Sequence, residues 1–188
     1  MAPKVVVITS SPNKDGLTAA CGTSAQEGAR EAGAETVILD LNSLKIGRCQ
    51  ACGTGYGPCR SEHVCQVRDD FQSAHSLVLS ADALVVVSPV YWGDLSESAK
   101  AFFDRLRRCE SINRDEQGLK GKPVIGVAAA GGSGNGTVTC LFAMQQFFNP
   151  MKMNIFDLIT VTRKSRPYKL EAIRSAAKAM VGSMQKQE

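Results

Sequence analysis

Short apolar runs alternate with stretches of helical periodicity along the whole chain, and this alternation restricts the possible folds more than any other feature. Strands separated by helices run parallel, and each helix crosses over one face of the sheet. Five such strands predict an α/β domain of three layers, a doubly wound parallel sheet in the order 2-1-3-4-5. The expected strands are Lys4–Thr9, Thr36–Leu41, Ala83–Ser88, Pro123–Ala129 and Ile155–Thr162. The expected helices are Leu17–Ala32, Asp69–Ser80, Ser96–Arg107, Val138–Phe148 and Leu170–Met184.

The length and charge of the chain fit one globular domain. Its 188 residues suit a single core, so residues 1–188 are expected to form one domain. Lys and Arg number 22 against 18 Asp and Glu, an excess too small and scattered to indicate a nucleic-acid partner. No apolar run approaches the ~20 residues that span a bilayer, and the first run is too short for a signal peptide. We therefore expect a cytoplasmic protein without a membrane partner. The basic cluster Arg163, Lys164, Arg166 and Lys169 is interpreted as a solvated loop, with a specific phosphate-binding role as the alternative.

The loop after the first expected strand is rich in hydroxyls and leads directly into a helix. Ser10, Ser11 and Thr18 supply hydroxyl groups, Asn13 supplies an amide, and Gly16 precedes the helix. Backbone N–H groups at a helix amino end favour a phosphate. The loop matches neither Walker A nor G-x-G-x-x-G. Taken alone, it is equally well explained as a Ser/Thr-rich helix cap.

Two further loops follow the third and fourth expected strands. The first is an aromatic turn formed by Pro89, Val90, Tyr91, Trp92 and Gly93. The second is a glycine-rich loop that contains Gly131, Gly132, Ser133 and Gly134. Taken alone, the first is equally well explained as a packed aromatic corner, and the second has a flexible loop as its alternative explanation. In the order 2-1-3-4-5, strands 1, 3 and 4 are neighbours, so all three loops meet at one edge of the sheet. Together they predict a site for a planar ring on a phosphorylated tail.

The motifs of these loops resemble those of the flavodoxin-like NAD(P)H-dependent FMN reductases. The similar segments are Ser11-Pro12…Gly16-Leu17-Thr18, Ser88-Pro89-Val90-Tyr91-Trp92-Gly93…Lys100-Ala101-Phe102-Phe103-Asp104-Arg105 and Gly131-Gly132-Ser133-Gly134. The resemblance covers essentially the whole chain. It implies a flavodoxin-like fold, FMN as cofactor and NAD(P)H as co-substrate.

By the same resemblance, individual residues receive roles toward FMN. Ser11, Asn13, Gly16 and Thr18 would hold the phosphate. The aromatic turn would lie along the isoalloxazine ring, and the glycine-rich loop would offer backbone N–H groups near its pyrimidine side. This chain has Ser10, Asn13 and Leu17 where the family usually has Gly, Arg and Asn. The loss of the Arg and Asn side chains is expected to weaken the grip on the phosphate.

Four cysteines, Cys49, Cys52, Cys59 and Cys65, follow the second expected strand with the spacing C-x2-C-x6-C-x5-C. Four thiolates at such spacing can hold an iron–sulfur cluster or zinc. The segment resembles that of the iron–sulfur flavoproteins, a branch of the same family, whose usual pattern is the tighter C-x2-C-x2-C. Three interpretations stay open: a cluster, a loop with free or partly buried thiols, and a zinc site or redox-active Cys49/Cys52 pair.

Three functional hypotheses follow. The first is an FMN-containing oxidoreductase that passes electrons from NAD(P)H to a quinone, a nitro or azo compound, a metal oxyanion or free flavin. The second is an iron–sulfur flavoprotein that acts as an electron carrier, and the third is a non-catalytic binding protein. Because the flavin carries the chemistry, no catalytic side chain is expected, and His63 and His75 receive no catalytic role.

A homodimer or homotetramer is also expected, because relatives in the resembling family commonly cover the flavin with a neighbouring subunit. The residues regarded as compatible with such a contact are Tyr91, Trp92, Phe147, Phe148, Met151 and Met153.

Overall fold

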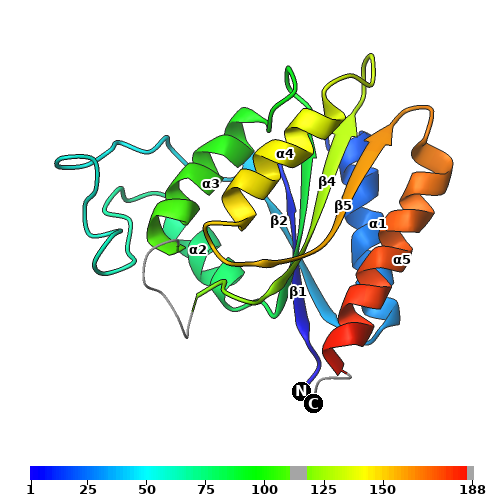
Figure 1. The fold of residues 1–188 in the computed structure, drawn as a ribbon, viewed down its shortest axis with the longest axis horizontal. Helices are drawn as coiled ribbons and strands as arrows, with labels where there is room; N and C mark the ends of the chain where they lie inside the picture. Colours follow the sequence, from blue (N-terminus) through cyan, green and yellow to red (C-terminus); the bar gives the residue numbers. More distant parts are fainter. Residues whose placement is uncertain (111–117, 186–188) are drawn as a thin grey trace.

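The computed structural model describes residues 1–110 and 118–185 of the chain (Figure 1). Within these residues, five parallel strands form one sheet in the order β2-β1-β3-β4-β5, as the alternation predicts. The strands are β1 (Lys4–Thr9), β2 (Glu35–Asp40), β3 (Ala83–Pro89), β4 (Pro123–Ala130) and β5 (Asn154–Thr162). The helices are α1 (Leu17–Glu31), the short 3-10 helix η1 (Leu41–Ser43), α2 (Phe71–Leu79), α3 (Glu97–Glu110), α4 (Thr137–Phe148) and α5 (Arg166–Gln185).

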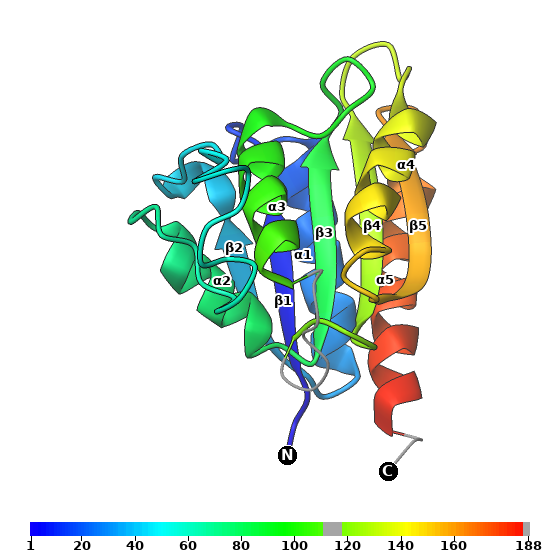
Figure 2. The ribbon, with the colours of Figure 1, turned by 60° about the vertical axis from the view of Figure 1, so that its left-hand side comes forward.

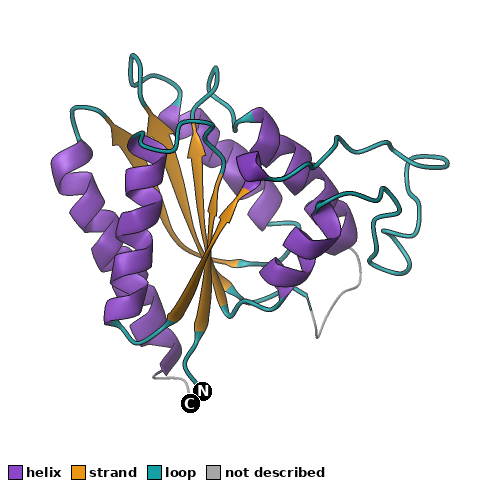
Figure 3. Cartoon of the chain, turned by 180° about the vertical axis from the view of Figure 1, so that it is seen from behind, coloured by secondary structure: helices purple, strands orange, loops and turns teal. Residues whose placement is uncertain are grey.

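The helices cover both faces of the sheet and complete a three-layer sandwich. In Figure 3, α1 and α5 lie on one side of the twisted sheet, with the remaining helices on the other. Side chains of β1 alternate between the two cores: Val5 and Val7 pack toward α1 and α5, whereas Val6 and Ile8 pack toward α2, α3 and α4. This alternation follows from the two-residue repeat of a strand, and it explains why the central runs are uniformly apolar.

Two helices begin at positions that differ from expectation, each for a local reason. The structure starts α2 at Phe71 rather than Asp69, because Asp69 Oδ1 accepts a hydrogen bond from the Phe71 N–H at 3.0 Å and so lies outside the helix. Conversely, α5 begins at Arg166, well before the expected Leu170. Pro167 is compatible with this early start, because the first helical turn needs no N–H from it.

Helix α5 packs directly onto α1, and the two helices run in the same direction. A Cβ added at Gly28 of α1 would lie 2.0 Å from the Arg174 carbonyl oxygen of α5, so only glycine permits this approach. Glu31 near the end of α1 pairs with Arg174, while Gln185 at the end of α5 donates to the Ala32 carbonyl at 3.1 Å. The amino ends of both helices therefore face the same edge of the sheet, where β1, β3 and β4 end.

A glycine cap ends α1. Gly33 has a φ of 85°, its N–H donates to the Arg30 carbonyl, and the Ala34 N–H donates to the Ala29 carbonyl. This is the double hydrogen bond of a Schellman motif, which requires a left-handed residue.

Among the helices of the described residues, none is both long and apolar enough to cross a lipid bilayer.

Candidate functional site

The loops after β1, β3 and β4 line one open cavity of about 630 Å³ at the carboxyl end of the sheet. Figure 2 shows the loops that follow β3 and β4 rising side by side above the strands. The lining residues come from four connections, the fourth being the segment between β5 and α5. They are Ser11, Pro12, Asn13, Asp15, Gly16, Leu17, Thr18, Pro89, Val90, Tyr91, Ala129, Gly131, Gly132, Arg163 and Arg166. The structure thus brings together the three loops that the sequence predicts to meet.

The β1–α1 loop is shaped by its own side chains. Ser11 Oγ accepts from the Asn13 N–H at 3.2 Å, and Asn13 Oδ1 accepts from the Asp15 N–H at 3.1 Å. Gly16 then begins α1 with no hydrogen bond from a side chain to the helix end among the described residues, and the first turn contains no acidic side chain. The first N–H groups of α1 are therefore available to an anion, and their dipoles favour one.

The turn after β3 is a tight reversal with Trp92 at its tip. The Tyr91 N–H donates to the Asp94 carbonyl at 2.9 Å, and the Asp94 N–H donates to the Tyr91 carbonyl at 3.0 Å. Trp92 and Gly93 between them have φ values of 51° and 83°, as a type I′ turn requires. A left-handed tryptophan is uncommon, because its Cβ crowds the backbone. The turn directs the indole outward, and Trp92 is fully exposed.

The turn after β3 also contacts the glycine-rich loop after β4 through two glycines. A Cβ at Gly136 would lie 2.7 Å from the Gly93 Cα, and a Cβ at Gly93 would lie 2.7 Å from Thr139 Oγ1. Both glycines have left-handed backbones, with φ near 80°. Trp92 and Gly93 therefore border a second cavity of about 490 Å³, whose other wall is residues 130–136.

The donor set and shape of the main cavity fit FMN. One end presents hydroxyls and helix N–H groups suited to a phosphate. The middle is bordered by Pro89, Val90 and Tyr91, which suit a flat apolar ring. A Cβ at Gly131 or Gly132 would meet no protein atom within 4 Å, so the space that side chains would fill is left open along this wall.

The structure places some predicted site residues away from the main cavity. Ser10 is buried beneath the loop, with its hydroxyl 3.5 Å from the Val87 carbonyl oxygen, and it does not line the cavity. Trp92, Gly93, Ser133 and Gly134 border the second cavity instead.

The sequence favoured a solvated loop over a phosphate-binding role for Arg163 and Arg166, and neither was predicted among the site residues. Both line the main cavity. The available signal was their position directly after the last strand, at the same edge of the sheet as the three loops.

The expected apolar contact surface is also partly wrong. Phe147, Phe148, Met151 and Met153 are buried within the subunit, so they belong to its own core. The exposed apolar side chains near the two cavities are Tyr91, Trp92, Val138 and Phe142.

The cysteine segment, residues 44–70, lies beside α2 and α3 and is held by α3. Figure 1 shows it extending beyond α2 and α3. Arg105 is completely buried and donates to the Gly47 carbonyl at 3.0 Å, the Val67 carbonyl at 2.9 Å and Asp69 Oδ2 at 2.7 Å. Arg108 donates to the Gly55 carbonyl. These bonds fasten an otherwise irregular segment at several points.

The Asp69–Arg105 pair is stabilised in its charged form. Burial alone would raise the pKa of Asp69, but hydrogen bonds from Arg105 and from the N–H groups of Gly47 and Phe71 lower it below its usual range. Burial likewise opposes the charge of Arg105, yet its hydrogen bonds to Asp69 and Cys65 raise the pKa of Arg105. The guanidinium also stacks 4.2 Å from the ring centroid of Phe71.

The four cysteines of this segment line a single small cavity together with Arg105 and Arg108. The number of thiols suits a cluster. Within residues 1–110 and 118–185, no three Cys, His, Asp or Glu side chains converge as ligands of one metal ion. As folded here, the segment is a half-buried loop with free thiols.

Three buried cysteines and two histidines do not line the main cavity. Burial raises the pKa of Cys21, Cys109 and Cys140 to about 12 each. His75 is buried, with Nε2 2.6 Å from Glu110 Oε1, and His63 Nδ1 lies 2.6 Å from the Cys109 carbonyl oxygen. Neither histidine lines the main cavity.

The strand order, the helices on both faces and the ligand-sized cavity at the carboxyl edge define a flavodoxin-like α/β protein. Solved structures with this fold include the following two. Flavone reductase gives a TM-score of 0.76 at 15% identity, covering 97% of this chain and 63% of that protein. NAD(P)H:quinone oxidoreductase from Methanothermobacter marburgensis gives a TM-score of 0.70 at 17% identity, covering 96% of this chain and 98% of that protein. Identities this low establish the fold alone.

Residues 3–165 match the family model of NADPH-dependent FMN reductase, and the chain belongs to that family. It is also 33% identical, over 134 residues, to an iron–sulfur flavoprotein of Methanosarcina thermophila. That match covers 71% of this chain and 65% of the relative, so the chain spans about two thirds of the relative's length.

Proposed function

We propose that the protein is an FMN-dependent oxidoreductase that passes electrons from NADH or NADPH to a small acceptor such as a quinone, a nitro or azo compound, a metal oxyanion or free flavin. One observation carries the proposal: loops from β1, β3 and β4 line the same cavity of about 630 Å³. The polar amino end of α1 suits the phosphate of FMN, and the aromatic turn suits its ring. The open glycine-rich wall suits the pyrimidine edge of that ring.

The roles of the residues follow from their groups. When bound, FMN would supply the hydride and electron chemistry, so no side chain of the protein acts as nucleophile or base. Ser11 and Thr18 would bind the phosphate through their hydroxyls, together with the first N–H groups of α1. Tyr91 would exclude water from one side of the ring. The N–H groups at Gly131 and Gly132 would stabilise negative charge on the pyrimidine side without reorganising.

The test uses flavin-free protein and follows Trp92, the only tryptophan of the chain. Added FMN should quench the Trp92 fluorescence, since Trp92 directly follows Tyr91, which lines the main cavity beside the proposed ring position. Anaerobic NADH or NADPH should then bleach the flavin absorbance, and a quinone should restore it with turnover. Absence of FMN binding, or a bound flavin that neither nucleotide reduces, would overturn the proposal.

A second candidate is an iron–sulfur flavoprotein that serves as an electron carrier. Two observations favour it: the four cysteines line one cavity, and a 33% identical relative carries that description. Iron and sulfide analysis after anaerobic purification tests it. Four irons per chain would support the carrier, whereas metal-free protein that turns over a quinone would exclude it.

Self-association into a homodimer or homotetramer forms part of the proposal. Val138 and Phe142 lie four residues apart on α4, on one exposed face, and Trp92 is exposed nearby on the adjoining cavity. Light scattering tests this, and a monomer at micromolar concentration would count against it.

A further inference from the structure

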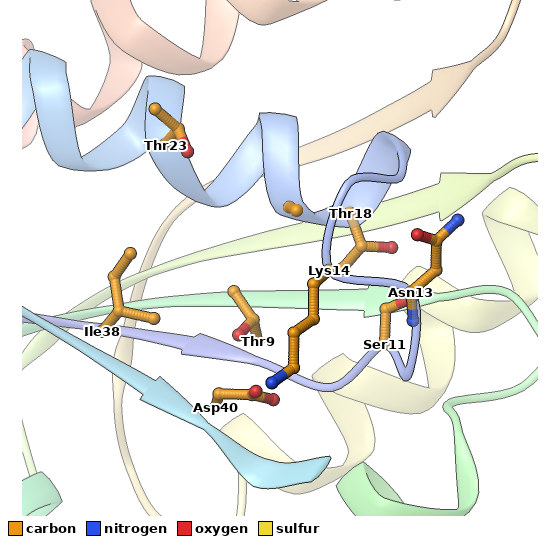
Figure 4. Close-up of a pocket in the computed structure, with 9 residues that line it drawn as sticks. Thr9, Ser11, Asn13, Lys14, Thr18, Thr23, Ile38 and Asp40 are labelled. Carbon is orange, nitrogen blue, oxygen red and sulfur yellow. The ribbon is translucent and has the colours of Figure 1, made fainter. Parts of the chain in front are cut away.

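The β1–α1 loop lacks a cation of its own at the main cavity. Its single basic residue, Lys14, lines an adjoining cavity of about 270 Å³ between α1 and the ends of β1 and β2, which shares Ser11, Asn13 and Thr18 with the main cavity. Figure 4 shows the Lys14 side chain extending toward Asp40, away from the start of α1. The loop therefore offers a phosphate only neutral hydroxyls, an amide and backbone N–H groups, while Asp15 adds a negative charge to the cavity lining.

The positive charge of the main cavity comes from a segment distant in sequence. Arg163 follows β5 and Arg166 begins α5, and both line the cavity together with Ser11, Gly16 and Thr18. Both side chains are exposed to solvent. Among the described residues, neither guanidinium forms an ion pair. Their charges are thus available to a ligand.

The position of Arg166 beside α1 is fixed by helix packing. Its charge acts on the buried Cys21 thiol of α1, whose pKa it lowers against the larger effect of burial. Farther along, Gly28 lets the α5 backbone approach α1, and Arg174 pairs with Glu31. Because the helices run side by side from the same edge, Arg166 is held next to the first turns of α1.

We propose that Arg163 and Arg166 form a clamp for the phosphate monoester of FMN, opposite the hydroxyls and N–H groups of the β1–α1 loop. This inference rests on the proposed FMN site and adds two phosphate-binding residues to it. A guanidinium suits a phosphate dianion because its planar donors bind two oxygens at once. The clamp supplies a positive charge from the β5–α5 connection, which the neutral amide of Asn13 cannot provide.

The experiment compares FMN with riboflavin, which has the same ring and no phosphate, on flavin-free full-length protein. Trp92 quenching and flavin fluorescence report the two dissociation constants. Arg163→Gln and Arg166→Gln should each weaken FMN binding about 10-fold, and the double variant about 100-fold, as expected for lost charge-assisted hydrogen bonds. Riboflavin binding should change by less than about twofold. Arg166→Lys should retain part of the FMN affinity, since it keeps the charge.

Lys164→Gln is the matched control, because Lys164 is an exposed neighbour with the same charge that does not line the cavity. It should leave FMN affinity unchanged. The clamp is overturned if the double variant binds FMN like the wild type, if FMN and riboflavin weaken equally, or if Lys164→Gln reproduces the loss.

The nicotinamide nucleotide is the other source of a phosphate monoester. A raised KM for NADPH, with KM for NADH and FMN affinity unchanged, would assign the arginines to that nucleotide and overturn the clamp. Failure of the wild-type protein to bind either flavin would instead overturn the proposed function itself.

Discussion

The loops of the main cavity and the cysteine segment are both irregular connections, yet different forces hold them. The cavity loops leave the ends of central strands, and every residue of β3 is buried. Their positions follow from a sheet covered on both faces. The cysteine segment has no strand to anchor it, and it is held by hydrogen bonds from Arg105 and Arg108 of α3 and from Gln72 of α2.

The difference indicates that the two regions can be disturbed separately. A cavity built on sheet ends keeps its geometry as long as the core is intact. A segment fastened by a buried guanidinium loses its shape when that one group is removed. Variants should therefore affect either the cavity or the cysteine segment, according to which support they remove.

Thiol reactivity should show the largest contrast. Cys21, Cys109 and Cys140 are buried, and a pKa raised from 9.0 to about 12 lowers the thiolate fraction about a thousandfold. The four thiols of the cysteine segment are only half-buried. A disulfide reagent should therefore titrate four fast thiols in the native protein and all seven in denaturant. Protection of all four fast thiols would break the comparison, because it would indicate that a metal engages them.

Arg105→Ala should destabilise the protein by about 3–5 kcal/mol, since it leaves the Asp69 carboxylate without its positive partner and removes the guanidinium hydrogen bonds to the Gly47 and Val67 carbonyls. Urea denaturation measures the loss, and limited proteolysis should cut first within residues 44–70. Arg107→Ala, on the same helix but without an ion pair among the described residues, should change stability by less than about 0.5 kcal/mol. If the Arg105 variant still protects residues 44–70 from proteolysis, the anchoring role is wrong.

Gly136→Ala should affect the cavity region and leave the cysteine segment intact. Its Cβ would combine a left-handed backbone with a 2.7 Å approach to Gly93, so we expect a loss of about 2–3 kcal/mol and weaker FMN binding. Gly121→Ala is the control, because Gly121 has a φ of 77° and a Cβ added there would meet no atom within 4 Å. This variant should lose only the stability that a left-handed alanine backbone costs, about 1 kcal/mol. Equal losses in the two variants would contradict the contact between the loops.

Asp69→Asn should give the smallest effect, about 2 kcal/mol, by removing a charge-assisted hydrogen bond. The pKa of Asp69 is lower in the folded than in the unfolded chain. Its stabilisation is therefore fully present above the unfolded pKa near 3.9, and it is lost as the pH falls through the folded pKa. Urea midpoints should converge for wild type and variant in acid below pH 3.9. A constant gap between the two down to pH 2 would contradict the ion pair.

Local patterns were enough to predict the strand order and the meeting of three loops. Each depends on the alternation of apolar residues and on the rule that parallel strands share one carboxyl edge. The directions in which individual side chains point were harder to predict from the sequence. Ser10 is predicted at the site, but it lies one position before the lining residue Ser11 and points into the core. The type I′ turn, rather than the aromatic composition, decides where Trp92 points.

By itself, the sequence determined the α/β class, the parallel order and the cavity at the strand ends, because these arise from the repeat of apolar residues along each element. Only the tertiary structure decided that Arg163 and Arg166 join that cavity and that Arg105 fastens the cysteine segment. These contacts join residues far apart in the chain, through the packing of α5 on α1 and of residues 44–70 on α3. The apolar repeat within one helix or strand does not predict such packing, since the packing depends on where whole helices lie relative to each other.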